Sequence, residues 1–310
     1  MLGAGYRRLW LALLLAILAT DLANCRSTAR ADPPIEIVTT LPVLKDLAEQ
    51  VGRPHVRVKS LLTGWENEHT YSPKPTDLIA IRRARLLFEI GLGLEVWVAS
   101  LVKNAGSPSL SVITTSRGVP LIHDDAEDHH QPSDNVTTHR LGNPHIWMDP
   151  NNVEVMARHI ADALIAVDPA QAENYRRNLA AYLEQVDKLR RELLERVSRL
   201  PDRRIVAHHP AWPYLAKRFG FEIAATIQIH AGAEPSALQL QQLIGKIKKE
   251  RLKVIASEIQ LSQRIPHLLA KETGATVVIL TTLPGGLPGT ESYLDMLRYN
   301  VLKLAEALES

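Results

Sequence analysis

The 310-residue chain is 45% hydrophobic and 23% charged, which is enough apolar sequence for one large or two ordinary globular domains. Without residues 1–31 it loses four arginines and one aspartate, and its formal net charge changes from +2 to −1, so no basic surface remains to favour nucleic acid. The only cysteine lies in that same segment, which excludes disulfides and thiolate metal sites from the remainder.

Residues 1–31 have the pattern of a secretory signal peptide. Arg7 and Arg8 precede the apolar run LWLALLLAILA, and Ala29-Arg30-Ala31 has the form of a signal-peptidase site. The apolar run is too short to span a membrane. We therefore expect an exported, periplasmic protein. The stretch LANC loosely matches a lipoprotein cleavage box, so lipid anchoring through Cys25 is the less favoured alternative.

From residue 32 onward, short β-branched runs alternate with amphipathic stretches, which predicts an α/β fold with parallel sheets covered by helices on both faces. The expected strands are 35–40, 55–63, 85–90, 109–115, 203–208, 221–229, 252–258 and 276–281. The expected helices cover 76–83, 95–103, 236–250 and 263–273, or begin near residues 42, 151, 212 and 290. Because this alternation of strands and helices occurs in two separate sets, we expect an N-terminal lobe over residues 32–168 and a C-terminal lobe over residues 201–310.

Residues 169–200 separate the two expected lobes and predict one long helix. Apolar residues recur three or four positions apart along it, namely Tyr175, Leu179, Tyr182, Val186, Leu189, Leu193 and Val197. At about 1.5 Å per residue the helix is roughly 48 Å long, longer than one small lobe is wide. A coiled-coil dimer would explain the stripe, but only about four heptads are present, so we favour a rigid linking helix packed along both lobes of a monomer.

The stretch 120–143 has no periodicity and gathers turn-forming residues, which predicts a surface loop. It contains the histidines His123, His129, His130 and His139. Three interpretations stay open for these residues: a solvated linker without a role, a weak auxiliary metal site, or a contact with a membrane permease or a metallochaperone.

Three other histidines follow the expected strands. His69 comes after the second strand, His145 follows the loop after the fourth, and His209 comes directly after the fifth. Ligands of open α/β sheets bind at the carboxyl ends of the strands. We therefore expect His69 and His145 from one lobe, and His209 from the other, to face one crevice between the lobes.

The segments around these histidines resemble a known family. HTYSPKPTDL (69–78), NPHIWMDPNN (143–152) and HPAWPYLAKRFGF (209–221) are similar to the three metal-histidine motifs of the periplasmic solute-binding proteins of zinc and manganese ABC transporters. ASEIQLSQRI and ESYLDMLRYNV extend the resemblance over nearly the whole mature chain. It implies two α/β lobes joined by one long helix, and metal ligands at His69, His145 and His209. It also implies a receptor without enzymatic activity that delivers its cargo to a membrane permease.

One departure from the family bears on the choice of metal. The family commonly has an aspartate ligand after the last strand, where this chain has Thr281 in LTTLPG. A hydroxyl is a weak ligand, so we expect three histidine nitrogens and an open position that water or Glu68 fills. Glu258 is expected to be a hydrogen-bond partner of a ligand. Three neutral imidazoles favour zinc as the bound cargo, with manganese or iron as the alternative.

Two other classes of function compete with a transport receptor. Three histidines and a water also form the catalytic zinc site of some hydrolases. The sequence has no HExxH helix, and no general base is securely positioned beyond Glu68 or Glu258. An adhesin or a metal store is the other alternative, although no repeat or exposed binding module supports it.

Overall fold

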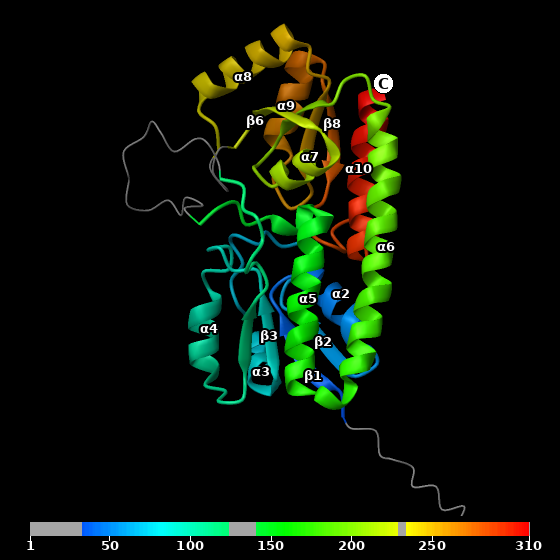
Figure 1. Cartoon of the computed structure of the whole chain (residues 1–310). Coiled ribbons are helices and arrows are strands. Elements are labelled where there is room, and N and C mark those ends of the chain that lie inside the picture. The colour runs from blue at the N-terminus through cyan, green and yellow to red at the C-terminus, as the bar shows by residue number, and fades with distance from the viewer. Residues whose placement is uncertain (1–32, 124–140, 229–233, 310) are drawn as a thin grey trace, which may run out of the picture. The chain divides into compact units, whose positions relative to one another are not determined.

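Two four-stranded, wholly parallel sheets form the framework of the protein (Figure 1). The computed structural model describes residues 33–123, 141–228 and 234–309. The first sheet has the order β2(Val56–Ser60), β1(Ile35–Thr39), β3(Leu86–Glu89), β4(Ser111–Thr114). The second has the order β6(Glu222–Thr226), β5(Arg204–Ala207), β7(Val254–Glu258), β8(Thr276–Leu280). The predicted α/β class and all eight predicted strands are confirmed.

Residues 34–168, here called the N-half, contain the first sheet, and residues 201–309, the C-half, contain the second. The N-half helices are α2(Pro42–Gly52), α3(Pro75–Arg83), α4(Val98–Ala105) and α5(Pro150–Val167). The C-half helices are α7(Pro213–Phe219), α8(Ala237–Glu250), α9(Arg264–Thr273) and α10(Tyr293–Glu309). Four of these eight begin with proline, which has no N–H to leave unpaired and is preset for the first turn.

The predicted linking helix is α6(Ala172–Ser198), preceded by a turn of 3-10 helix over Pro169–Gln171. Its buried residues are Tyr175, Tyr182, Val186, Leu189, Leu193 and Val197, and the remaining stripe residue, Leu179, is half-buried. α6 packs on α2 and α5 in the N-half and on α7 and α10 in the C-half (Figure 1). The stripe is therefore covered within the chain, which favours the linking helix over the coiled-coil dimer.

The two halves share one hydrophobic core. A single cluster of buried side chains includes Ile37 and Trp147 of the N-half together with Trp212 and Leu308 of the C-half. A smaller cluster lies within the C-half, around Ile247 and the helices α8 and α9. Close-packed interiors resist deformation, so a shared core opposes a wide hinge movement between the halves.

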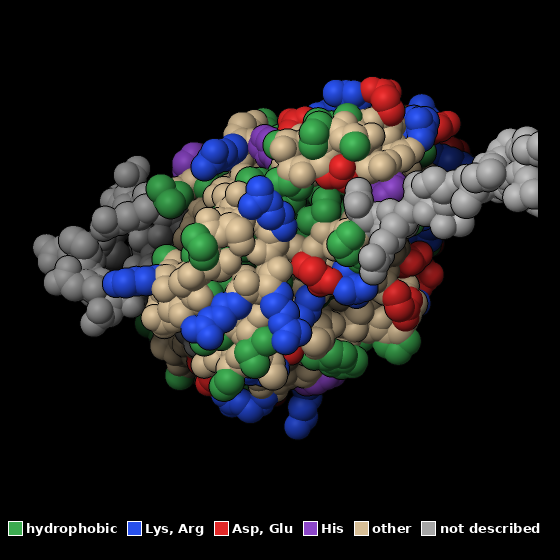
Figure 2. Space-filling model, turned by 90° about the horizontal axis from the view of Figure 1, so that it is seen from below, with side chains coloured by type: hydrophobic (Ala, Val, Ile, Leu, Met, Phe, Trp, Pro, Cys, Tyr) green, Lys and Arg blue, Asp and Glu red, His purple; other side chains and the backbone are tan. Residues whose placement is uncertain are grey.

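Several sequence predictions lie outside the described residues: the signal peptide 1–31 with Cys25, and most of the loop 120–143. Within the described ranges, no helix has the length and apolar character needed to cross a bilayer. The face of the protein seen in Figure 2 carries both basic and acidic side chains among hydrophobic and uncharged ones. That face therefore offers no uniform basic surface.

Candidate metal site

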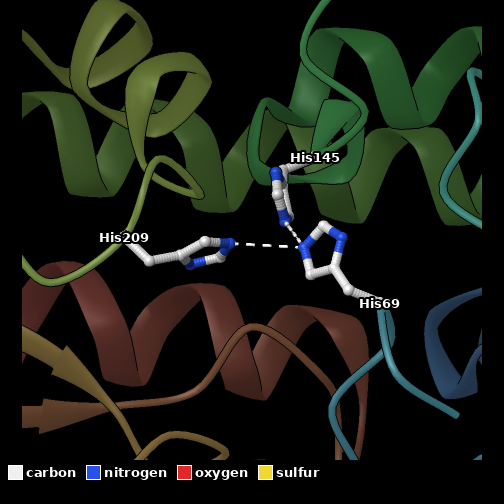
Figure 3. Close-up of side chains that lie close together, drawn as sticks. All are labelled: His69, His145 and His209. Carbon is white, nitrogen blue, oxygen red and sulfur yellow. Dashed lines mark hydrogen bonds between the residues drawn. The ribbon is translucent and has the colours of Figure 1, made fainter. Parts of the chain in front are cut away.

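Three histidines from separate segments converge where the two halves meet (Figure 3). His69 lies on the segment after β2, and His209 follows β5. His145 precedes the 3-10 helix Ile146–Met148, which leads into α5. The structure thus brings together the three histidines predicted from the sequence, two from the N-half and one from the C-half.

The ring nitrogens of the three histidines lie close to one another. Nε2 of His69 is 3.1 Å from Nε2 of His145 and 3.3 Å from Nε2 of His209. Each ring offers a potential ligand atom within 4.8 Å of the others. His145 and His209 are buried, whereas His69 is half-buried. The group is therefore shielded from water on the side of His145 and His209.

The ring of His209 is oriented by Glu258, the last residue of β7. His209 Nδ1 lies 3.2 Å from Glu258 Oε1, which also accepts a hydrogen bond from Trp212 Nε1 at 2.5 Å. Glu258 is 1% exposed, and its carboxylate can only accept from the imidazole when ionised. The imidazole proton is therefore placed on Nδ1, which leaves the lone pair of Nε2 facing the other histidines.

The ring of His145 is oriented in the same way by Asn143. The amide nitrogen of Asn143 donates to Pro210 O at 2.7 Å, and its Oδ1 accepts from the His145 backbone N–H at 3.0 Å. These two partners determine which end of the amide is oxygen. His145 Nδ1 lies 3.0 Å from that oxygen, so it carries the ring proton and Nε2 again presents its lone pair.

This arrangement suits a metal better than a hydrogen bond. His69 Nε2 faces two lone pairs and could donate one proton to only one of them, whereas a cation among the three nitrogens satisfies all of them. A tetrahedral ion with bonds of about 2.0–2.1 Å holds its nitrogens roughly 3.3–3.4 Å apart, and a six-coordinate ion with similar bonds holds them about 2.9 Å apart. The observed separations of 3.1 and 3.3 Å lie within that span. The histidine triad is therefore a site for a divalent metal of either coordination number.

Glu68 lies beside the triad. Its side chain is 2% exposed, and Oε1 is 3.7 Å from His145 Nε2. That oxygen has no hydrogen-bond partner among the described residues. Burial raises the pKa of Glu68. A buried carboxylate oxygen without a partner is costly unless a cation or a proton neutralises it, so Glu68 is suited to face a metal.

Thr281 has a different role from the aspartate that it replaces in the family pattern. It is fully buried, and its hydroxyl donates to Leu283 O at 2.7 Å and accepts from Gln260 Nε2 at 2.8 Å. Because both functions of the hydroxyl are engaged within the C-half, Thr281 holds the turn after β8. His208, the neighbour of His209, is also buried, and its Nδ1 lies 2.9 Å from Ser257 Oγ.

Most of the loop that contains the candidate auxiliary metal site lies outside the described residues. His123 is exposed and does not belong to the triad. His129, His130 and His139 lie outside the described residues, so the predicted auxiliary metal site stays a prediction.

Sequence reasoning missed the contacts that join the halves around the site. Asp149 caps α5 by accepting from Asn151 N at 2.8 Å, and it also binds Arg218 of α7 through two hydrogen bonds of 2.7 and 2.9 Å. Gln260 donates to Gly64 O at 2.7 Å, on the segment that leads to His69. The position of Asp149 in NPHIWMDP predicts either a helix cap or a partner that orients an imidazole, and the structure shows the cap. Neither long-range partner leaves a local pattern in the sequence.

Residues 37–307 match the model of the family described as zinc-uptake complex component A, periplasmic, or ZnuA. The chain belongs to this family. A ZnuA crystal structure superimposes with a TM-score of 0.78 at 30% identity, covering 89% of this chain and 99% of that one. The superposition shows that the chain has the ZnuA fold.

Two proteins similar to this chain are named for metals other than zinc. The iron-binding protein YfeA of Yersinia pestis is 29% identical over 276 residues, which cover 87% of this chain and 85% of YfeA. The manganese ABC transporter substrate-binding lipoprotein PsaA of Streptococcus pneumoniae is 27% identical over 311 residues, covering 97% of this chain and 96% of PsaA. Similarity at this level does not select a metal.

Membership of the ZnuA family establishes the class of function. Its members are extracytoplasmic, non-catalytic metal-binding components of ABC transporters, as periplasmic proteins or as lipoproteins. The chain is accordingly a solute-binding protein for a divalent metal, and its partner is the membrane permease of such a transporter. The hydrolase alternative has no support in this family.

Proposed function

We propose that this chain is a zinc receptor that holds one ion between His69, His145 and His209 and delivers it to the permease. The observation that carries the proposal is the convergence of three Nε2 atoms, with separations of 3.1 and 3.3 Å from His69 to the other two. Neutral imidazole is a preferred ligand of zinc, and three of them with one further position form a usual zinc site.

Glu68 is proposed to supply the fourth position, directly or through a water. Its partnerless oxygen is 3.7 Å from His145 Nε2, and a water can occupy the same place when a metal is bound. Glu258 holds the ring of His209 without contacting the metal itself. Thr281 is left out of the ligand set because its hydroxyl is engaged with Leu283 and Gln260.

The alternative cargo is manganese or iron. The buried carboxylate of Glu68 is the observation that favours it, because carboxylate oxygens suit manganese and higher coordination numbers. Against it, the nitrogen ligands outnumber this single carboxylate three to one. We therefore place zinc first.

We also propose export and a two-lobed organisation as the sequence predicts them. Residues 1–31 would be removed as a signal peptide, which leaves a periplasmic monomer with lobes 32–168 and 201–310 on either side of the helix 169–200. Lipid attachment at Cys25 is the alternative. For the loop histidines His123, His129, His130 and His139 the proposal is a weak auxiliary zinc site, with a solvated linker or a contact with the permease or a metallochaperone as the alternatives.

Metal analysis and calorimetry test the choice of cargo. Protein purified from the periplasm should contain about one zinc per chain, and titration of the metal-free protein should give tighter binding for zinc than for manganese or iron(II). Copper is not informative, since it binds most such sites tightly. A chain that retains manganese or iron and binds zinc more weakly would overturn the zinc assignment.

A further inference from the structure

Gln260 joins the segment that carries His69 to the C-half. It lies two residues after the end of β7, and its amide nitrogen donates to Gly64 O at 2.7 Å and to Thr281 Oγ1 at 2.8 Å. The Thr281 hydroxyl donates its hydrogen bond to Leu283 O at 2.7 Å, so its oxygen is an acceptor for Gln260. A carbonyl and an accepting hydroxyl both require nitrogen at this end of the amide, which determines its orientation.

Glycines let the two backbones approach at this point. Gly64 has a φ of +104°, and a Cβ atom built on it would lie 2.5 Å from Pro284 O. A Cβ atom on Gly286 would lie 2.8 Å from Gln260 Nε2 and 2.9 Å from Gly64 O. Any side chain at either glycine would therefore push residues 63–64 away from residues 284–286.

The segment of His145 is held to the C-half by more contacts, and three of these are made by buried side chains. Asn143 donates to Pro210 O at 2.7 Å, Tyr214 Oη donates to Asn143 O at 2.8 Å, and Trp147 Nε1 donates to Thr282 O at 2.7 Å. The hydrogen bond from Gln260 to Gly64 O is instead made by a half-buried side chain. Loss of this one side chain should therefore loosen the His69 segment while the His145 segment stays in place.

We propose that Gln260 is a positioning residue for metal binding, whose amide fixes residues 63–69, and with them the His69 imidazole, against the C-half. This role rests on the proposed metal function. A His69 ring fixed at 3.1 and 3.3 Å from its two partners can close the site, whereas a loosened segment lets His69 leave first. Gln260 thus determines how long a bound ion stays.

Hydrogen exchange on the metal-free protein tests the positioning without any metal. We expect Gln260→Met, which keeps the volume but removes the donor, to raise amide exchange in residues 62–69 while residues 143–149 stay unchanged. The control is Gln185→Met, an exposed position on α6. Unchanged exchange in 62–69, or an equal rise in both segments, would overturn the proposal.

Stopped-flow release of zinc to a chromogenic chelator tests the consequence. The dissociation rate should rise about 2- to 10-fold in Gln260→Met, the range expected for one hydrogen bond, with a smaller change in the association rate. Thr281→Val, which removes the acceptor that orients the amide, should also raise it, and the double variant should be no faster than the faster single one. Gly286→Ala should act likewise, with Gly245→Ala, where a Cβ meets open space, as its control.

The outcomes separate the two proposals. Absence of zinc binding by the unmodified chain would overturn the zinc assignment together with the role of Gln260 in zinc release. Zinc binding with an unchanged dissociation rate in both Gln260→Met and Gly286→Ala would overturn the role of Gln260 alone.

Discussion

The segments that carry His145 and His69 enter the same site but are built differently. Residues 143–149 are buried and joined to the C-half by hydrogen bonds from Asn143 and Trp147 and by the ion pair of Asp149 with Arg218. Residues 63–69 contain exposed and half-buried positions besides the buried Gly64 and Glu68. Outside the histidine triad, the hydrogen bond from Gln260 to Gly64 O joins them to the C-half. The site is therefore preorganised on the side of His145 and completed by a less extensive contact on the side of His69.

A site in which the His145 segment is firmly held and the His69 segment is held by fewer contacts suits a receptor that must release its cargo. The shared core and α6 oppose a wide hinge between the halves. Movement of a short segment does not disturb that core. Exchange of the ion is therefore expected to depend on residues 63–69 more than on separation of the two halves.

The largest expected effect comes from removing a ligand. Alanine in place of His69, His145 or His209 should weaken zinc binding by more than the roughly 10- to 100-fold that loss of an outer partner costs. Isothermal titration of each variant measures it, with the exposed His267→Ala as control. Unchanged affinity in all three variants would refute the ligand assignment.

The comparison also predicts a variant that affects stability without affecting the metal. Arg218→Ala leaves the carboxylate of Asp149, which is 10% exposed, without its bidentate partner. Unfolding in urea should show a loss of about 1–3 kcal/mol, with zinc affinity nearly unchanged. Arg176→Ala, which breaks an exposed ion pair with Glu173 on α6, should cost less than about 1 kcal/mol. Equal losses in the two variants would mean that the pair with Asp149 does not hold residues 143–149.

A smaller effect is expected from the partner of His209. Glu258→Gln keeps the shape of the side chain but removes the negative charge that orients and polarises the imidazole. Zinc affinity should fall about tenfold, while the exposed Glu195→Gln on α6 should leave it unchanged. A fall as large as that of His209→Ala would instead indicate that Glu258 contacts the metal.

The smallest expected effect lies away from both segments and depends on pH. Glu95 is buried and accepts hydrogen bonds from Thr40 Oγ1, Ile90 N and Gly91 N; burial raises its pKa to about 7 from the usual 4.5. The Glu95 carboxyl therefore binds its proton more tightly in the folded protein than in the unfolded chain. The stability that this proton contributes is lost as pH rises through 7. Between pH 6 and 8 the loss should be about 1 kcal/mol relative to Glu95→Gln, measured by urea unfolding. Parallel pH profiles of the two proteins would contradict this origin.

Much of the fold was predictable because periodicity and strand-forming residues are local signals. All eight strands and the stripe of α6 were recovered in this way. The start of α4 was placed at residue 95, but the helix begins at Val98. The reason is that Glu95 turns its carboxylate back to the N–H groups of Ile90 and Gly91, so residues 95–97 form a turn.

The metal-binding side chains of the site were predictable from their residue type and from their positions after predicted strands. His69, His145 and His209 could be named because imidazoles at the carboxyl ends of strands are a recognisable signal. The oxygen of Gly64 could not be paired with Gln260, because a contact between an amide and a backbone carbonyl 196 positions away leaves no pattern in either segment. Thr281 stands where the family pattern has an aspartate ligand, and nothing in the sequence indicates its hydrogen bonds with Leu283 and Gln260.

Nitrogen NMR of the protein with isotope-labelled histidine, without metal and with one equivalent of zinc, tests the central claim most directly. We expect His145 and His209 to carry their proton on Nδ1 in both states, and we expect zinc to shift the Nε2 resonances of these two histidines and of His69. Shifts at other histidines in place of these three, or a proton on Nε2 of His145 or His209 in the metal-free protein, would contradict it.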